Sequence, residues 1–78
     1  MDESKLLEII AEYANYEANK ITRDMTFSDD LGIDSLELVD VIAAIEDAYN
    51  VEIEDEELMS GLETVGNAID LLKEKVND

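Results

Sequence analysis

The sequence predicts an all-α protein, a small four-helix bundle of three longer helices and one short helix. Four segments carry apolar residues at helical spacing, and no repeat, linker or low-complexity segment separates them. The chain of 78 residues is long enough for one modest hydrophobic core. We therefore expect a single domain over residues 1–78.

The first helix is predicted over residues 3–16, because apolar residues recur there at i, i+1, i+4, i+7 and i+8. This expected inner face consists of Leu6, Leu7, Ile10, Tyr13 and Ala14. Residues 17–34 form a connection of a length that is rarely structureless in a small domain. We expect an ordered loop that is anchored on the core by Ile21, Met25, Phe27, Leu31 and Ile33.

The second helix is predicted over residues 34–49, with Asp34 as its N-cap and Glu37 completing a pair that resembles a capping box. Its inner face is expected to consist of Leu38, Val41, Ile42, Ile45 and Tyr49. Its outer face is expected to consist of Leu36, Val39, Asp40, Ala43 and Asp47. Exposed Leu and Val among carboxylates indicate a surface that contacts other molecules.

The remaining two helices are predicted near the end of the sequence. A short one covers residues 55–60, ahead of Gly61, and a longer one covers residues 65–76, with Thr64 as its cap. Lys73 and Lys75 suit the negative end of the longer helix dipole. Its inner stripe is expected to consist of Val65, Ala68, Ile69, Leu72 and Val76.

The charge is strongly acidic and unevenly distributed. There are 22 acidic and 5 basic residues, giving a net charge of −17, and no Lys or Arg lies between Asp24 and Leu72. Such a surface repels nucleic acids and anionic membranes and attracts basic protein patches. No apolar run approaches the roughly 20 residues that span a membrane, and the acidic start does not resemble a signal peptide. We expect a cytoplasmic protein without membrane insertion.

The absence of His and Cys limits the available chemistry. It excludes the usual zinc, haem and iron–sulfur sites and the Ser–His and Cys–His pairs that activate nucleophiles. Carboxylate pairs can hydrolyse sugars, but a bundle of this size offers little room for a sugar cleft. Asp29, Asp30 and Asp34 do not match a calcium loop. We expect neither intrinsic catalysis nor a specific metal site.

One stretch suggests a modification site. The sequence Asp30-Leu31-Gly32-Ile33-Asp34-Ser35-Leu36-Glu37 resembles the site at which acyl carrier proteins are modified, a helix that begins at an Asp-Ser-Leu triplet. The resemblance covers essentially the whole chain, including Ile21-Thr22, Phe27, Val51-Glu52-Ile53 and Thr64-Val65-Gly66-Asn67-Ala68. One departure is Glu54, where related sequences often have proline.

The resemblance implies that Ser35, between Asp34 and Leu36, carries a covalent 4′-phosphopantetheine arm. A phosphopantetheinyl transferase with magnesium would move the group from coenzyme A to Ser35, and the terminal thiol would carry acyl groups as thioesters for fatty acid or polyketide biosynthesis enzymes. The first helical position also suits an attached phosphate, because free N–H groups and the helix dipole favour an anion there. The carboxylates of Asp34 and Glu37 oppose that anion, which indicates a site presented to another enzyme.

Partner enzymes with basic patches are expected on the outer face of the second helix, and the free protein is expected to be a monomer. The expected contact residues are Leu36, Glu37, Val39, Asp40, Ala43 and Asp47. An acyl chain is expected to be sheltered against the inner face of this helix, near Ile42, Ile45, Leu58 and Ala68.

Two alternatives stay open at the level of sequence. One is a specialised aminoacyl or peptidyl carrier of a secondary-metabolite or cell-wall pathway, although Asp34 before Ser35 favours acyl cargo. The other belongs to a different class, an acidic DNA mimic or an inhibitor of basic proteins. Such a protein needs distributed negative charge but no serine at a helix start.

Overall fold

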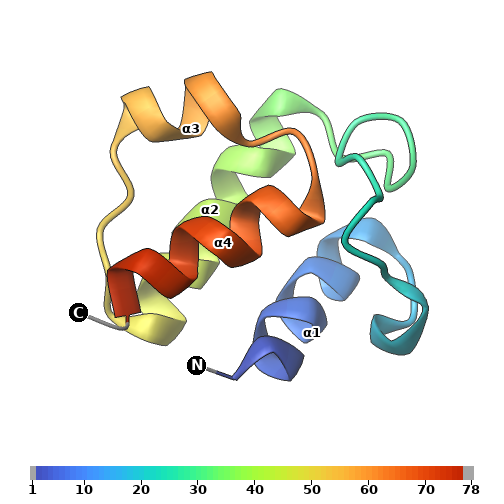
Figure 1. The fold of residues 1–78 in the computed structure, drawn as a ribbon. Coiled ribbons are helices and arrows are strands. Elements are labelled where there is room, and N and C mark those ends of the chain that lie inside the picture. The colour runs from blue at the N-terminus through green and yellow to red at the C-terminus, as the bar shows by residue number, and fades with distance from the viewer. Residues whose placement is uncertain (1, 77–78) are drawn as a thin grey trace.

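The computed structural model describes residues 2–76, apart from the side chain of Met59. The chain forms α1 (Glu3–Ala14), a 3₁₀ turn η1 (Ala18–Lys20), α2 (Ser35–Tyr49), α3 (Asp55–Gly61) and α4 (Val65–Val76). Figure 1 shows three longer helices with the short α3 at one edge. Within residues 2–76 no strand forms, so the predicted all-α bundle is confirmed.

The helix α1 ends at Ala14, earlier than the predicted residue 16. Asn15 takes the left-handed conformation, with φ of 59°, and its N–H donates to the carbonyl of Ala11. The N–H of Tyr16 donates to the same carbonyl at 3.3 Å. Asparagine tolerates this conformation because its short polar side chain can bond locally, so Asn15 stops the helix while the apolar spacing continues.

The caps explain where the other helices begin. Asp34 accepts the Glu37 N–H at 2.8 Å, so α2 starts at Ser35 with Asp34 as the predicted cap. The helix α3 runs one residue beyond the predicted end, to Gly61. At its start the Glu57 carboxylate accepts the Glu54 N–H at 3.2 Å, so glutamate serves as the start of this helix without a proline.

The connection between α1 and α2 is ordered, as predicted, and is tied to the connection between α3 and α4. The Phe27 N–H donates to Glu63 at 3.0 Å, and the Val65 N–H donates to Met25 at 3.0 Å. Thr26 and Thr64 form an isolated antiparallel bridge between them. These bonds join two segments that are distant in sequence and fix the entrance to α4.

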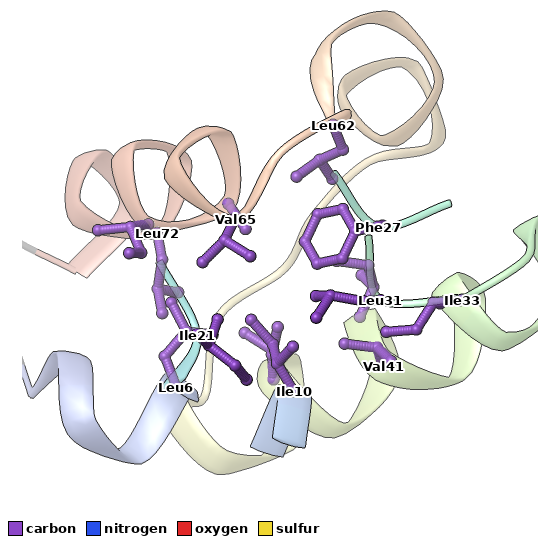
Figure 2. Packing of buried hydrophobic residues seen from close by; sticks show 14 residues of the cluster. Leu6, Ile10, Ile21, Phe27, Leu31, Ile33, Val41, Leu62, Val65 and Leu72 are labelled. Carbon is purple, nitrogen blue, oxygen red and sulfur yellow. The ribbon is translucent and has the colours of Figure 1, made fainter. Parts of the chain in front are cut away.

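The core draws on both connections as well as on the helices. Figure 2 shows Phe27 and Leu62, from the two connections, pointing into the same cluster as Val41 of α2 and Val65 of α4. Its buried members are Leu6, Ile10, Ile21, Phe27, Leu31, Ile33, Val41, Ile42, Ile45, Leu62, Val65, Ala68, Ile69 and Leu72.

Two residues predicted to lie on inner helical faces are exposed. Tyr13 of α1 retains 38% of its accessible surface and Val76 of α4 retains 37%. Val76 is the last residue of its helix, beyond the core. Tyr13 lies close to the end of α1, at the edge of the stripe that begins with Leu6, and is not among the residues packed against the core cluster.

Candidate functional site

Ser35 is the first residue of α2, and its side chain is exposed. Asp34 immediately before it is extended, with φ of −80° and ψ of 178°, so the chain turns sharply into the helix. Asp34 accepts the N–H of Glu37 through its side chain and that of Leu38 through its carbonyl, both at 2.8 Å. Among the described residues, the N–H groups of Ser35 and Leu36 have no hydrogen-bond acceptor.

The segment before Ser35 is rigidly held. Leu31 and Ile33 are buried, and the Ile33 N–H donates to Phe27 at 2.7 Å. Between them Gly32 adopts a φ of +66°, which non-glycine residues take only at a cost. Upstream, the Asp30 carboxylate accepts the Thr26 N–H at 2.8 Å. These contacts hold the backbone that leads into Ser35.

A groove of about 470 Å³ opens beside Ser35, between the first turns of α2 and the helix α3. Its lining combines aliphatic side chains with two polar ones, and consists of Ser35, Leu36, Leu38, Val39, Asp55 and Leu58. The exposed hydroxyl, the two unpaired N–H groups and the apolar groove together fit a phosphate-linked arm with an apolar cargo.

The predicted outer face of α2 is assembled on one exposed surface. Leu36 and Val39 are 79% and 51% exposed and lie one helical turn apart, so they are neighbours on this surface. The other predicted contact residues, Glu37, Asp40, Ala43 and Asp47, are exposed as well. Carboxylates therefore surround two bare aliphatic side chains next to Ser35.

The predicted cargo residues are divided between the groove and the core. Leu58 is half-buried and lines the groove, whereas Ile42, Ile45 and Ala68 are buried behind it. These three core residues do not line the groove, whereas Leu38 and Leu58, both half-buried, do. Sequence reasoning missed Asp55 at the rim, because its place depends on how α3 packs against α2.

The basic side chains all contact other parts of this chain. Arg23 meets Asp70, Lys73 meets Glu3 and Lys75 meets Glu57, each at 2.9 Å. Lys20 pairs with Glu17 at 3.4 Å. Lys5 lies 5.5 Å from the centre of the Tyr49 ring and donates to the Ala48 carbonyl at 3.4 Å.

Two of these ion pairs, and the partial burial of one tyrosine, change the pKa values of the side chains involved. The hydrogen bond from Lys75 lowers the pKa of Glu57, and the same bond raises the pKa of Lys75. The hydrogen bond to Asp70 raises the pKa of Arg23. Desolvation raises the pKa of Tyr49, whose hydroxyl donates to the Asp2 carbonyl at 2.6 Å.

Within residues 2–76, no three or more carboxylates gather as a metal site. Of the helices formed by these residues, none has both the length and the apolar character needed to cross a bilayer.

Comparison with known proteins shows the family to which the chain belongs. A model of the family described as "Phosphopantetheine attachment site" matches residues 4–72. The acyl carrier protein of Petrotoga mobilis is 48% identical over 73 residues, covering 94% of this chain and 85% of that protein. An acyl carrier protein of Porphyromonas gingivalis is 35% identical over 74 residues, covering 95% and 94% of the two chains.

The fold and the family match define a helical carrier that bears a covalent phosphopantetheine group. Within that class the chain belongs to the acyl carrier protein family. Its cofactor is 4′-phosphopantetheine, and members of the family act as carriers rather than catalysts.

Proposed function

We propose that Ser35 is the residue to which 4′-phosphopantetheine is attached. The observation that carries this proposal is an exposed hydroxyl at the first residue of a capped helix, opening onto an apolar groove. The N–H groups of Ser35 and Leu36 are available to the phosphate, and Asp34 orients the turn. When bound, the group supplies the thiol that holds an acyl chain as a thioester.

Intact-mass analysis tests the attachment residue. Incubation with coenzyme A, magnesium and a broad-specificity phosphopantetheinyl transferase should add one phosphopantetheinyl group to the wild-type protein. Ser35→Ala should gain none and stay folded, because an exposed first-turn serine contributes little packing. Ser28→Ala is the matched control, since Ser28 is exposed on the preceding loop, and should be modified like the wild type. Modification of Ser35→Ala at another serine would overturn the assignment.

The groove beside Ser35 is proposed to receive the start of an acyl chain. Its aliphatic walls, Leu36, Leu38, Val39 and Leu58, favour apolar cargo by the hydrophobic effect. A longer chain needs the groove to extend between Leu38 and Leu58 toward Ile42, Ile45 and Ala68. NMR shifts at these three residues should then change with acyl length, and the absence of any change would mean that the cargo stays in solvent.

The outer face of α2 is proposed to dock the partner enzymes, first the phosphopantetheinyl transferase and then enzymes of fatty acid or polyketide biosynthesis. Exposed carboxylates increase the rate of encounter with a basic patch, while Leu36 and Val39 supply a small desolvated centre. A carrier that serves several enzymes needs brief contacts, and a small interface of this kind gives modest affinity.

The remaining features of the proposal follow from the same carrier role. We expect one acyl carrier domain over residues 1–78, a monomer that does not itself catalyse a reaction, and a cytoplasmic location. Near-complete coverage of relatives named acyl carrier protein supports acyl over aminoacyl or peptidyl cargo. Sedimentation of the purified protein and fractionation of cells test the oligomeric state and the location.

A further inference from the structure

A second groove, of about 290 Å³, lies between α1 and α2 and is separate from the groove at Ser35. It is lined by Ile9, Glu12 and Tyr13 of α1 and by Ala44 of α2. Tyr13 retains 38% of its accessible surface, although the helical spacing predicts it for the core. Tyr13 is not part of the core cluster, so its position beside the groove is not explained by packing of the core.

The walls of this groove combine three kinds of contact. Ile9 and Ala44 are half-buried and offer aliphatic surface, Glu12 is exposed and offers a carboxylate, and Tyr13 offers an aromatic side chain. An arginine side chain matches all three, because its stem is apolar and its planar guanidinium both pairs with carboxylates and stacks on aromatic rings. Lysine presents a compact, strongly hydrated charge and matches them less well.

The charges around the groove favour a cationic occupant. Asp40 and Asp47 are four residues before and three residues after Ala44, so they lie on the same side of α2, above and below the groove wall. The only cation of α1, Lys5, contacts Ala48 and Tyr49 at the far end of α2 instead. A second copy of this chain, with net charge −17, and an anionic membrane would both be repelled.

We propose that the groove between α1 and α2 receives an arginine side chain from the basic surface of a partner protein. The groove adjoins the outer face of α2 through Asp40 and Asp47, so a partner docked on that face would reach it. The partner protein itself is part of the proposed carrier function, on which this proposal rests. The chemistry of the groove can be tested without any partner enzyme.

Two peptides of equal charge, one with four Gly-Arg repeats and one with four Gly-Lys repeats, serve as probes. At low salt, the arginine peptide should shift NMR signals of the Tyr13 ring and of the Ile9 and Ala44 methyl groups in a saturable way. Its affinity should exceed that of the lysine peptide by roughly two- to fivefold, the range expected for an exposed cation–π contact.

Variants separate the ring from the general negative charge. Tyr13→Leu keeps an apolar side chain and should abolish the preference for arginine, whereas Tyr16→Leu, at a tyrosine that is 41% exposed but does not line the groove, should retain it. Glu12→Gln should weaken binding of both peptides. Circular dichroism verifies that each variant is folded, and Tyr13→Phe, which retains the ring, should keep the preference.

Equal affinity for the two peptides would overturn the proposal. So would a preference that survives Tyr13→Leu, or shifts confined to the first turn of α2. The mass test on Ser35 reports the carrier function separately. If the protein is modified but shows no preference for arginine, only the proposed arginine site in the groove is refuted. A protein that shows the preference but is not modified refutes only the attachment site.

Discussion

Gly32 determines the direction in which the chain enters α2. Its φ of +66° lies in the left-handed region, and a Cβ added there would meet no atom within 4 Å. Gly32→Ala should therefore destabilise the protein by about 1 kcal/mol through backbone strain alone, without a steric clash. Urea unfolding followed by circular dichroism measures this change in the free energy of unfolding.

Two substitutions control for the cause of that loss. Gly61→Ala, at a glycine with equally open surroundings but no positive φ, should not destabilise and should favour the end of α3. Gly32→Asn should cost less than Gly32→Ala, because asparagine adopts this conformation readily, as Asn15 and Asn50 do here. Equal losses for Gly32→Ala and Gly61→Ala would show that backbone strain at Gly32 is not the cause.

At the scale of elements, α3 is the shortest α-helix, and none of its described side chains is fully buried. It has 7 residues, and a groove lies on each side: one lined by Leu38 and Leu58 toward α2, another lined by Gly61 and Leu71 toward α4. The ion pair between Lys75 and Glu57 links it to α4 at 2.9 Å. Access to the groove beside Ser35 therefore depends on how firmly α3 is held.

Removing this ion pair should loosen α3 selectively. Glu57→Gln should speed amide hydrogen exchange in α3 more than in α4, while Glu56→Gln, at an exposed neighbour, should leave both unchanged. Because Lys75 lowers the pKa of Glu57, the stabilising contribution is present above the ordinary glutamate pKa and is lost as the pH falls through the lowered one. Exchange in α3 that is insensitive to both Glu57→Gln and acid would refute this role.

Docking on the outer face of α2 should depend on its carboxylates mainly through the association rate. Asp40→Lys combined with Asp47→Lys should slow modification by a basic transferase at low salt, because both carboxylates are exposed on this face. Leu36→Ala should slow it with little change in salt dependence, since the side chain contributes apolar contact. Steady-state kinetics across a salt series distinguish the two effects.

A charge-matched control tests whether position or total charge matters. Glu63→Lys combined with Glu74→Lys makes the same change in net charge at exposed residues outside α2. This pair should slow modification much less than the pair on α2. Equal slowing by the two pairs would mean that the overall field, not the outer face of α2, brings the transferase to the protein.

At the scale of the whole molecule, negative charge opposes folding. With a net charge of −17 the native state repels itself, so its melting temperature at neutral pH should rise with added salt or millimolar magnesium. Differential scanning calorimetry with matched sodium and magnesium salts measures this effect. A melting temperature that responds to neither addition would contradict it.

The sequence predicted much of this fold because local signals agree with one another. Asp34 and Thr64 are caps that can be recognised from residue type and position, and both accept the expected bonds, at 2.8 Å from Glu37 and 3.2 Å from Asn67. The candidate site was also recognised from local signals, namely a serine at a predicted helix start with Gly32 three residues before it. In the structure Ser35 is the first residue of α2, and its role as the attachment residue stays a prediction.

What the sequence did not predict depends on distant contacts. Helical spacing assigned Tyr13 to the core, but the core is already filled by side chains from the two connections, such as Phe27 and Leu62. The bonds between those connections join residues that no local pattern relates. The place of Asp55 at the groove follows from the packing of α3, and the same holds for the groove at Tyr13.

The positions of the lysines also affect the chemical stability of the acyl thioester. A thioester is readily attacked by an unprotonated amine, and a lysine beside the arm would remove the acyl group by forming an amide. None of the lysines belongs to α2 or α3, and the ion pair with Glu57 raises the pKa of Lys75, so its amine stays protonated and is a poor nucleophile. We therefore expect the charge distribution that attracts partners to protect the acyl group from aminolysis by its own carrier.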